Sequence, residues 1–162
     1  MLSFLLEHGA NPDPKMPNSS YSPLRTAVGK GHLQIARLLL EFNAKSNHHF
    51  RIPEWEATQR PTALALAAKS GHLEIMDLLI DRGARAGEGI EGKRYSAITS
   101  AAKAGQESAV ARLLLMYDSR DIGTLKYANE AVKDEHDGIK SMIEERIWQL
   151  VEESRGAVVA GQ

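Results

Sequence analysis

The chain contains no cysteine among its 162 residues. Without a thiol it cannot form a disulfide framework, a thiolate zinc site or a cysteine nucleophile. Disulfides accumulate in oxidising compartments, so their absence is compatible with a reducing one. We therefore expect an intracellular location, cytoplasmic or nuclear.

The chain also lacks long apolar runs and a strong net charge. No apolar run approaches the roughly 20 residues that a membrane span needs. The opening MLSFLLE, residues 1–7, is too short for a signal peptide and has no basic flank. The formal net charge of −1 gives no general attraction to nucleic acid or to an anionic membrane. We therefore expect no nucleic-acid partner and no membrane partner.

What the chain does contain is a repeated phrase. GHLQIARLLLEFNA at residues 31–44 returns as GHLEIMDLLIDRGA at 71–84, with seven of the fourteen positions identical. The apolar residues of each copy recur on one helix face. Upstream, Ser22 and Thr62 can cap a short helix that stops at Gly31 or Gly71. The predicted unit is a capped short helix, a glycine turn, a longer apolar helix and a loop.

Other copies of this unit are less regular. The third begins at Ser96 and turns at Gly105, but its leucine run follows the glycine one residue later than in the first copy, which indicates an inserted residue. A fourth copy ends in an apolar pattern up to Ile143 and carries Glu135 where the turn glycine belongs. Residues 2–10 correspond only to the second helix of a unit.

These units resemble ankyrin repeats, whose pattern runs T-P-L-H-x-A-A, then G-H, a V/I-x-x-L-L helix and G-A. The matching stretches are Ser22-Pro23-Leu24, Ala27, Gly31-His32, Leu38-Leu39 and Ala44, and Thr62, Leu64, Ala67-Ala68, Gly71-His72, Leu78-Leu79 and Gly83-Ala84. The resemblance covers about residues 2–147. It implies an all-α solenoid of stacked helix-turn-helix units with hairpin loops. The family's histidine after T-P-L is replaced by Arg25, Ala65 and Thr99, so the hydrogen-bond ladder of those histidines is absent.

We expect one domain over residues 1–162. Its parts are a partial unit (1–14), three repeats (15–47, 48–86 and 87–120), a degenerate capping repeat (121–154) and a tail (155–162). Residues 139–153 predict a longer amphipathic C-terminal capping helix. The N-terminal end has no such cover. Either the chain is a fragment of a longer array, or it self-associates through the apolar residues Leu2, Leu5 and Leu6.

The period of the repeat is broken at one place. Leu24 and Leu64 lie 40 residues apart, against the usual ankyrin period of about 33. The surplus lies in the 45–61 loop, KSNHHFRIPEWEATQRP, and insertions of this kind often lie on the binding face. Aromatic and arginine side chains are common interface anchors. We therefore expect the loop to contact a partner through Phe50, Arg51, Trp55 and Arg60. The alternative is that Phe50 and Trp55 form a small local core.

Further contact residues follow from the resemblance. Ankyrin domains tend to bind partners through hairpin tips and the exposed face of the first helices. Lysines precede the turns there, which suits an acidic peptide, and tyrosines precede the capping serines. The residues concerned are Tyr21, Arg25, Lys30, Lys69, Tyr95 and Lys103. The alternatives are a solvated polar face for the lysines and cross-hairpin packing for the tyrosines.

Catalytic and ligand motifs are weak by comparison. GEGIEG at 87–92 is a literal G-x-G-x-x-G, but no predicted strand precedes it, so no nucleotide site is expected. An acid–base site under the 45–61 loop could use His48 or His49 with Glu54 or Glu56, yet nothing in the spacing demands it. We predict a non-enzymatic protein-binding module without metal or cofactor. A small-molecule-binding protein or atypical enzyme is the alternative.

Overall fold

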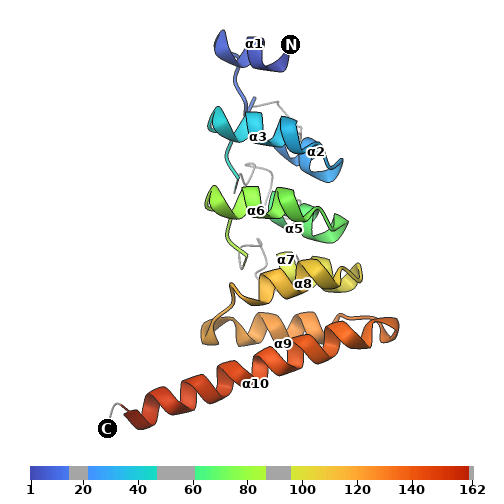
Figure 1. Ribbon diagram of the computed structural model, residues 1–162, viewed down its shortest axis with the longest axis vertical. Coiled ribbons are helices and arrows are strands. Elements are labelled where there is room, and N and C mark those ends of the chain that lie inside the picture. Colours follow the sequence, from blue (N-terminus) through green and yellow to red (C-terminus); the bar gives the residue numbers. More distant parts are fainter. Residues whose placement is uncertain (15–21, 47–60, 87–95, 161–162) are drawn as a thin grey trace, which may run out of the picture.

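Every element in the described part of the chain is a helix, which confirms the predicted all-α class. The computed structural model describes residues 1–14, 22–46, 61–86 and 96–160, without the side chains of Ser119 and residues 156–160. Figure 1 shows the elements in order: α1 (Leu2–Glu7), α2 (Pro23–Gly29), α3 (Leu33–Glu41), α5 (Ala63–Ser70), α6 (Leu73–Asp81), α7 (Ala97–Lys103), α8 (Glu107–Leu114), η1 (Ser119–Asp121), α9 (Ile122–Glu130), η2 (Asp134–His136) and α10 (Asp137–Ala160). No described helix is both long and apolar enough to cross a membrane.

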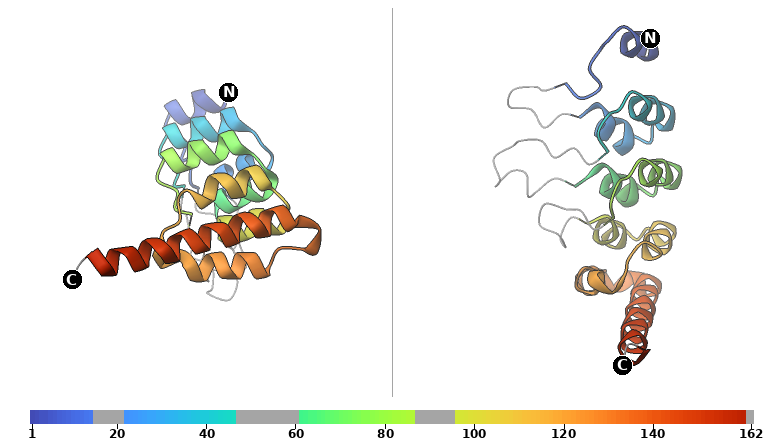
Figure 2. Two further views of the ribbon diagram at one scale, coloured as in Figure 1. Left: turned by 60° about the horizontal axis from the view of Figure 1, so that its bottom comes forward. Right: turned by 90° about the vertical axis from the view of Figure 1, so that its left-hand side faces the viewer.

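The helices form two layers of an elongated stack. The inner layer consists of α2, α5, α7 and α9, and each of these helices contacts the next. The outer layer consists of α1, α3, α6, α8 and α10 (Figure 2, right). Each inner helix pairs with the outer helix that follows it, as α2 does with α3. The predicted solenoid of helix-turn-helix units is confirmed.

Side-chain caps start the first three inner helices at equivalent positions. The side chain of Ser22 accepts a hydrogen bond from the Arg25 amide (3.3 Å). Thr62 accepts from Ala65 (3.1 Å), and Ser96 from Thr99 (3.3 Å). Each hydroxyl satisfies an amide that has no partner inside its helix. The caps predicted from the sequence are therefore present.

Left-handed glycines end these same inner helices. Gly31, Gly71 and Gly105 have φ angles of 73°, 70° and 70°, a region that costs other residues energy. A side chain of the next unit packs on each glycine: His72 on Gly31, Gln106 on Gly71 and His136 on Gly105. His72 and His136, which cover two of these glycines, are each half-buried, and this contact gives them a structural role.

The core lies between the two layers. Small residues of the inner helices, such as Ala67 in α5 and Ala101 in α7, are fully buried and let these helices approach closely. Larger side chains from the outer helices, Met76, Leu79 and Leu113 among them, fill the space between the layers. The stack is thus one continuous apolar core.

The expected insertion in the third unit is wrong. Helix α8 begins two residues after Gly105, just as α6 begins two residues after Gly71. Leu113 is fully buried at the same distance from its glycine as Leu79, whereas Leu115 is 83% exposed. The third unit therefore contains no inserted residue, and its outer helix keeps the register of the others. The run of leucines begins one residue later in the sequence, so its last member, Leu115, lies outside the stripe that faces the core.

The two ends of the stack differ. Helix α10 has 24 residues and buries Ile139, Ile143 and Leu150, which confirms the predicted capping helix. At the other end Leu5 is 47% exposed, and no described inner helix lies beside α1 (Figure 1). Leu6 is buried in the core and Leu2 packs against it. Of the three leucines expected to mediate self-association, Leu5 is the one that presents substantial surface.

Candidate functional site

The ends of the inner helices present a line of exposed lysines. Lys30 follows the last residue of α2, Lys69 lies in the last turn of α5, and Lys103 ends α7. All three side chains are exposed. The glycine turns bring these helix ends to equivalent positions in successive units. The inner layer therefore carries one lysine per unit at this edge.

Lys103 has an aromatic neighbour in the next unit. Its Nζ lies 5.9 Å from the centre of the Tyr127 ring of α9. This distance is near the limit for a cation–π interaction, which at an exposed site contributes about 0.5–1 kcal/mol. The ring restrains the lysine side chain without neutralising its charge.

Charge is distributed unequally between the two layers. The inner helices contain four basic residues, Arg25, Lys69, Lys103 and Lys126, and a single acidic residue, Glu130. The outer helices contain eleven acidic and five basic residues. A chain with a net charge of −1 thus has a basic inner layer and an acidic outer layer.

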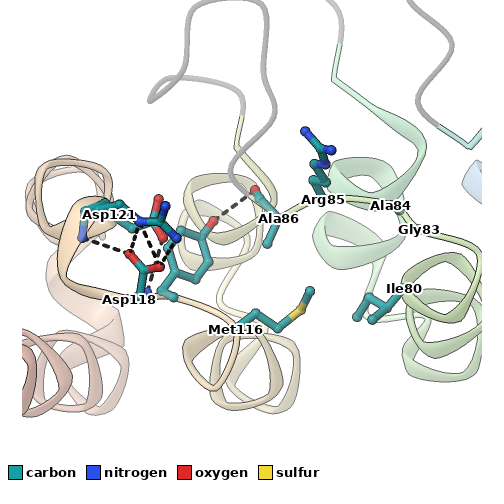
Figure 3. Close-up of a pocket in the computed structure, with 10 residues that line it drawn as sticks. Ile80, Gly83, Ala84, Arg85, Ala86, Met116, Asp118 and Asp121 are labelled. Atoms are coloured by element: carbon teal, nitrogen blue, oxygen red, sulfur yellow. Dashed lines mark hydrogen bonds and ion pairs between the residues drawn. The ribbon is translucent and has the colours of Figure 1, made fainter.

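A hollow of about 420 Å³ opens where α6 and α8 end (Figure 3). It is lined by Ile80, Gly83, Ala84, Arg85, Ala86, Met116, Tyr117, Asp118, Arg120 and Asp121. Buried Tyr117 donates its hydroxyl hydrogen to the carbonyl oxygen of Ala86 (2.9 Å). The hydroxyl therefore serves to join two neighbouring units.

Three charged residues of the hollow, Asp118, Arg120 and Asp121, stabilise its own backbone turn. Asp118 accepts a hydrogen bond from the Arg120 amide (2.8 Å), and Asp121 accepts one from the Asp118 amide (3.2 Å). The Arg120 guanidinium also donates to Asp118, and these hydrogen bonds lower the pKa of that carboxyl. Asp118 and Asp121 thus form a capping box around η1. This use of the charges favours a structural role for the hollow.

Comparison with protein families agrees with the stacked geometry. Family models described as ankyrin repeats in three copies and ankyrin repeats in many copies match residues 49–126 and 1–40, respectively. The chain belongs to the ankyrin-repeat family.

Curated relatives align with about half of this chain. It is 37% identical over 89 residues to the transient receptor potential channel pyrexia of Drosophila melanogaster, covering 54% of this chain and 9% of the relative. It is 38% identical over 84 residues to the ankyrin repeat and KH domain-containing protein mask of D. melanogaster, covering 52% of this chain and 2% of the relative. The same identity over 84 residues relates it to the ankyrin repeat and KH domain-containing protein 1 of Homo sapiens, covering 52% of this chain and 3% of that relative. The chain spans less than a tenth of each relative.

Arg25 differs from the lysines of this ankyrin domain. It occupies the first turn of α2, where its amide completes the Ser22 cap, and its side chain is half-buried. Lys30, Lys69 and Lys103 lie at the opposite ends of their helices. The structure therefore groups the three lysines and separates Arg25 from them.

The remaining expected contact residues lie outside the described part of the chain. They are Tyr21, Phe50, Arg51, Trp55, Arg60 and Tyr95, together with the alternative acid–base residues His48, His49, Glu54 and Glu56. Among the described residues, no group of three histidine, aspartate or glutamate side chains is placed to hold a metal ion.

Tyr117 and its capping box were missed by sequence reasoning. The equivalent positions of the two preceding ankyrin units hold Asn43 and Gly83, both with positive φ. A tyrosine is strongly disfavoured in that conformation, so the third unit closes through a 3₁₀ turn instead. The loss of an Asn or Gly at a repeated turn position was the available signal.

Tyr117→Phe should destabilise the ankyrin domain by about 1–2 kcal/mol, because the Ala86 carbonyl loses its partner.

Burial also raises the pKa of Tyr117 above its usual value. The unfolded tyrosine ionises near pH 10 while the folded one stays protonated, so stability should fall as pH rises above about 10. Tyr117→Phe should lose part of this alkaline decline. Urea unfolding at neutral pH and about pH 11 measures both effects, with Tyr127→Phe as the control. Equal curves for the two variants would contradict the assignment.

Proposed function

We propose that this chain is a non-enzymatic protein-binding module whose inner layer binds an acidic segment of a partner protein. Ankyrin repeats are in general protein–protein interaction modules. The observation that carries the finer proposal is the separation of charge between the two layers. An acidic segment is attracted to the inner layer and repelled by the outer one, which orients it during encounter. An intracellular location is part of the same proposal.

Lysine is well suited to this role at an exposed edge of the stack. Its charge ends a flexible stem, so it can follow a partner whose carboxylates are not rigidly placed. Each exposed ion pair contributes only about 0.2–1 kcal/mol, so affinity must come from several pairs together. Binding should accordingly weaken as salt is added.

Lys69→Glu should weaken binding of a glutamate-rich peptide roughly three- to tenfold, because it removes one attraction and adds one repulsion. Arg37→Glu is the matched control, since it makes the same charge change at an exposed outer-layer position in α3. Fluorescence anisotropy of the labelled peptide at low ionic strength gives the two dissociation constants. Circular dichroism checks that both variants are folded. Equal weakening by both variants would mean that net charge, and not the inner layer, attracts the peptide.

A further inference from the structure

Three lysines share one position in the register of the repeat, two of them at the ends of the inner helices α5 and α7 and one, Lys133, three residues after the end of α9. Lys69, Lys103 and Lys133 each lie three residues before the side chain that packs on the preceding unit's glycine, namely His72, Gln106 and His136. The contact of His136 with Gly105 shows that the last unit keeps this register although Glu135 replaces its glycine. We call these three lysines the lysine row.

The charges of the lysine row are accessible. All three side chains are exposed. Among the described residues, Lys69 makes no ion pair, Lys103 lies over the Tyr127 ring, and Lys133 lies 3.6 Å from a carboxylate oxygen of the equally exposed Glu135. None of them is held in a buried pair that a ligand would have to break.

The spacing of the lysine row follows from how its helices pack. Lys69 lies on α5 and Lys103 on α7, and these two helices contact each other; Lys133 follows α9, which contacts α7. Packed helices lie about 8–10 Å apart. An extended peptide advances about 3.1–3.4 Å per residue. The step from Lys69 to Lys103 therefore equals about three residues of an extended peptide, while two residues would fall short of this distance and four would exceed it. The shared register of Lys133 extends the row by a further step.

We propose that the lysine row binds an extended acidic peptide whose carboxylates recur at every third residue. This inference rests on the proposed function and adds to it the conformation and spacing of the partner segment. Each carboxylate then lies opposite one lysine, and the two residues between carboxylates bridge neighbouring units. A cluster of adjacent carboxylates reaches one lysine well and the others poorly.

Three peptides of identical composition test the spacing. The first repeats the triplet Glu-Pro-Ser, the second has the same glutamates at alternate positions in one half, and the third has them adjacent. Their prolines keep all three from forming helices. Measured by fluorescence anisotropy at low ionic strength, the triplet peptide should bind roughly fivefold more tightly than the clustered one, because it aligns two further exposed ion pairs.

A matched pair of variants locates the effect. Lys103→Gln removes the middle lysine of the row and should abolish most of the triplet peptide's advantage. Lys126→Gln makes the same charge change in the inner layer but outside the row, and it should preserve that advantage. An advantage that is equal in both variants would overturn the assignment to the lysine row.

The remaining outcomes separate the two proposals. Equal affinity for the three peptides, with all of them weakened by Lys69→Glu but not by Arg37→Glu, would overturn the spacing and leave the acidic-partner function standing. Binding of none of the peptides would overturn both.

Discussion

Leu79→Ala is expected to lower the free energy of unfolding by about 2–5 kcal/mol. Leu79 is completely buried in α6 between the inner and outer layers. Truncation removes favourable burial and leaves a cavity that neighbouring helices on both sides cannot fill without moving. Urea unfolding monitored by circular dichroism measures the loss.

Leu5→Ala is the control that the repeat itself supplies. The Ala10 amide donates to the Leu5 carbonyl (2.9 Å), and the Ala84 amide donates to the Leu79 carbonyl at the same distance. The two leucines thus hold the same repeat position, but Leu5 is 47% exposed. Its truncation should lower stability by about 1 kcal/mol or less. Equal losses for the two variants would contradict the two-layer packing described for α6.

Gly105→Ala is expected to destabilise the fold by roughly 1–3 kcal/mol. The φ angle of 70° strains any residue with a Cβ. An added Cβ would also lie 2.5 Å from Cε1 of His136, so that ring would have to move. The variant therefore disturbs both the turn of the third unit and its contact with the fourth. Thermal or urea unfolding measures the effect.

Two comparisons separate these causes. Gly29→Ala changes a helical glycine whose added Cβ would meet nothing within 4 Å, and it should be neutral or stabilising because alanine favours helix. Adding His136→Ala to Gly105→Ala removes the collision and leaves the strain at φ. A double variant as stable as His136→Ala alone would show that the strain at Gly105 is negligible.

Much of the fold could be predicted from local signals. The caps at Ser22, Thr62 and Ser96 and the turns at Gly31, Gly71 and Gly105 depend on residue types whose preferences act over a few residues. The repeat then multiplies these signals, since the same unit must bury the same face in each copy. For this reason the all-α stack and the capping helix α10 were predicted correctly.

The third unit shows where local signals were insufficient. The leucines at 113–115 were read as a displaced copy of those at 38–40, which required an insertion. The structure instead buries Leu113 and exposes Leu115. A helix that begins at a fixed distance from its turn presents only one stripe to the core, and a run of identical residues does not show which of them lies on that stripe.

The candidate site was predictable in part. The position of the lysines before each turn was visible in the sequence, and their exposure follows from the polar side of each inner helix. The contrast between a basic inner layer and an acidic outer layer was not visible, because basic and acidic residues alternate along the chain as the helices do. The closure at Tyr117 was also missed, since its partner Ala86 lies 31 residues away.

The sequence by itself determined the repeated unit, its caps, its glycine turns and the all-α class, because these rest on backbone preferences and on the periodicity of apolar residues. The tertiary structure decided which equivalent residues are buried, as with Leu5 and Leu79, and which side chains cover each glycine. It also brought Lys69, Lys103 and Lys133 into one row. The physical reason is that a repeat buries its surface only against its neighbours, so the fate of each side chain depends on the units stacked on either side.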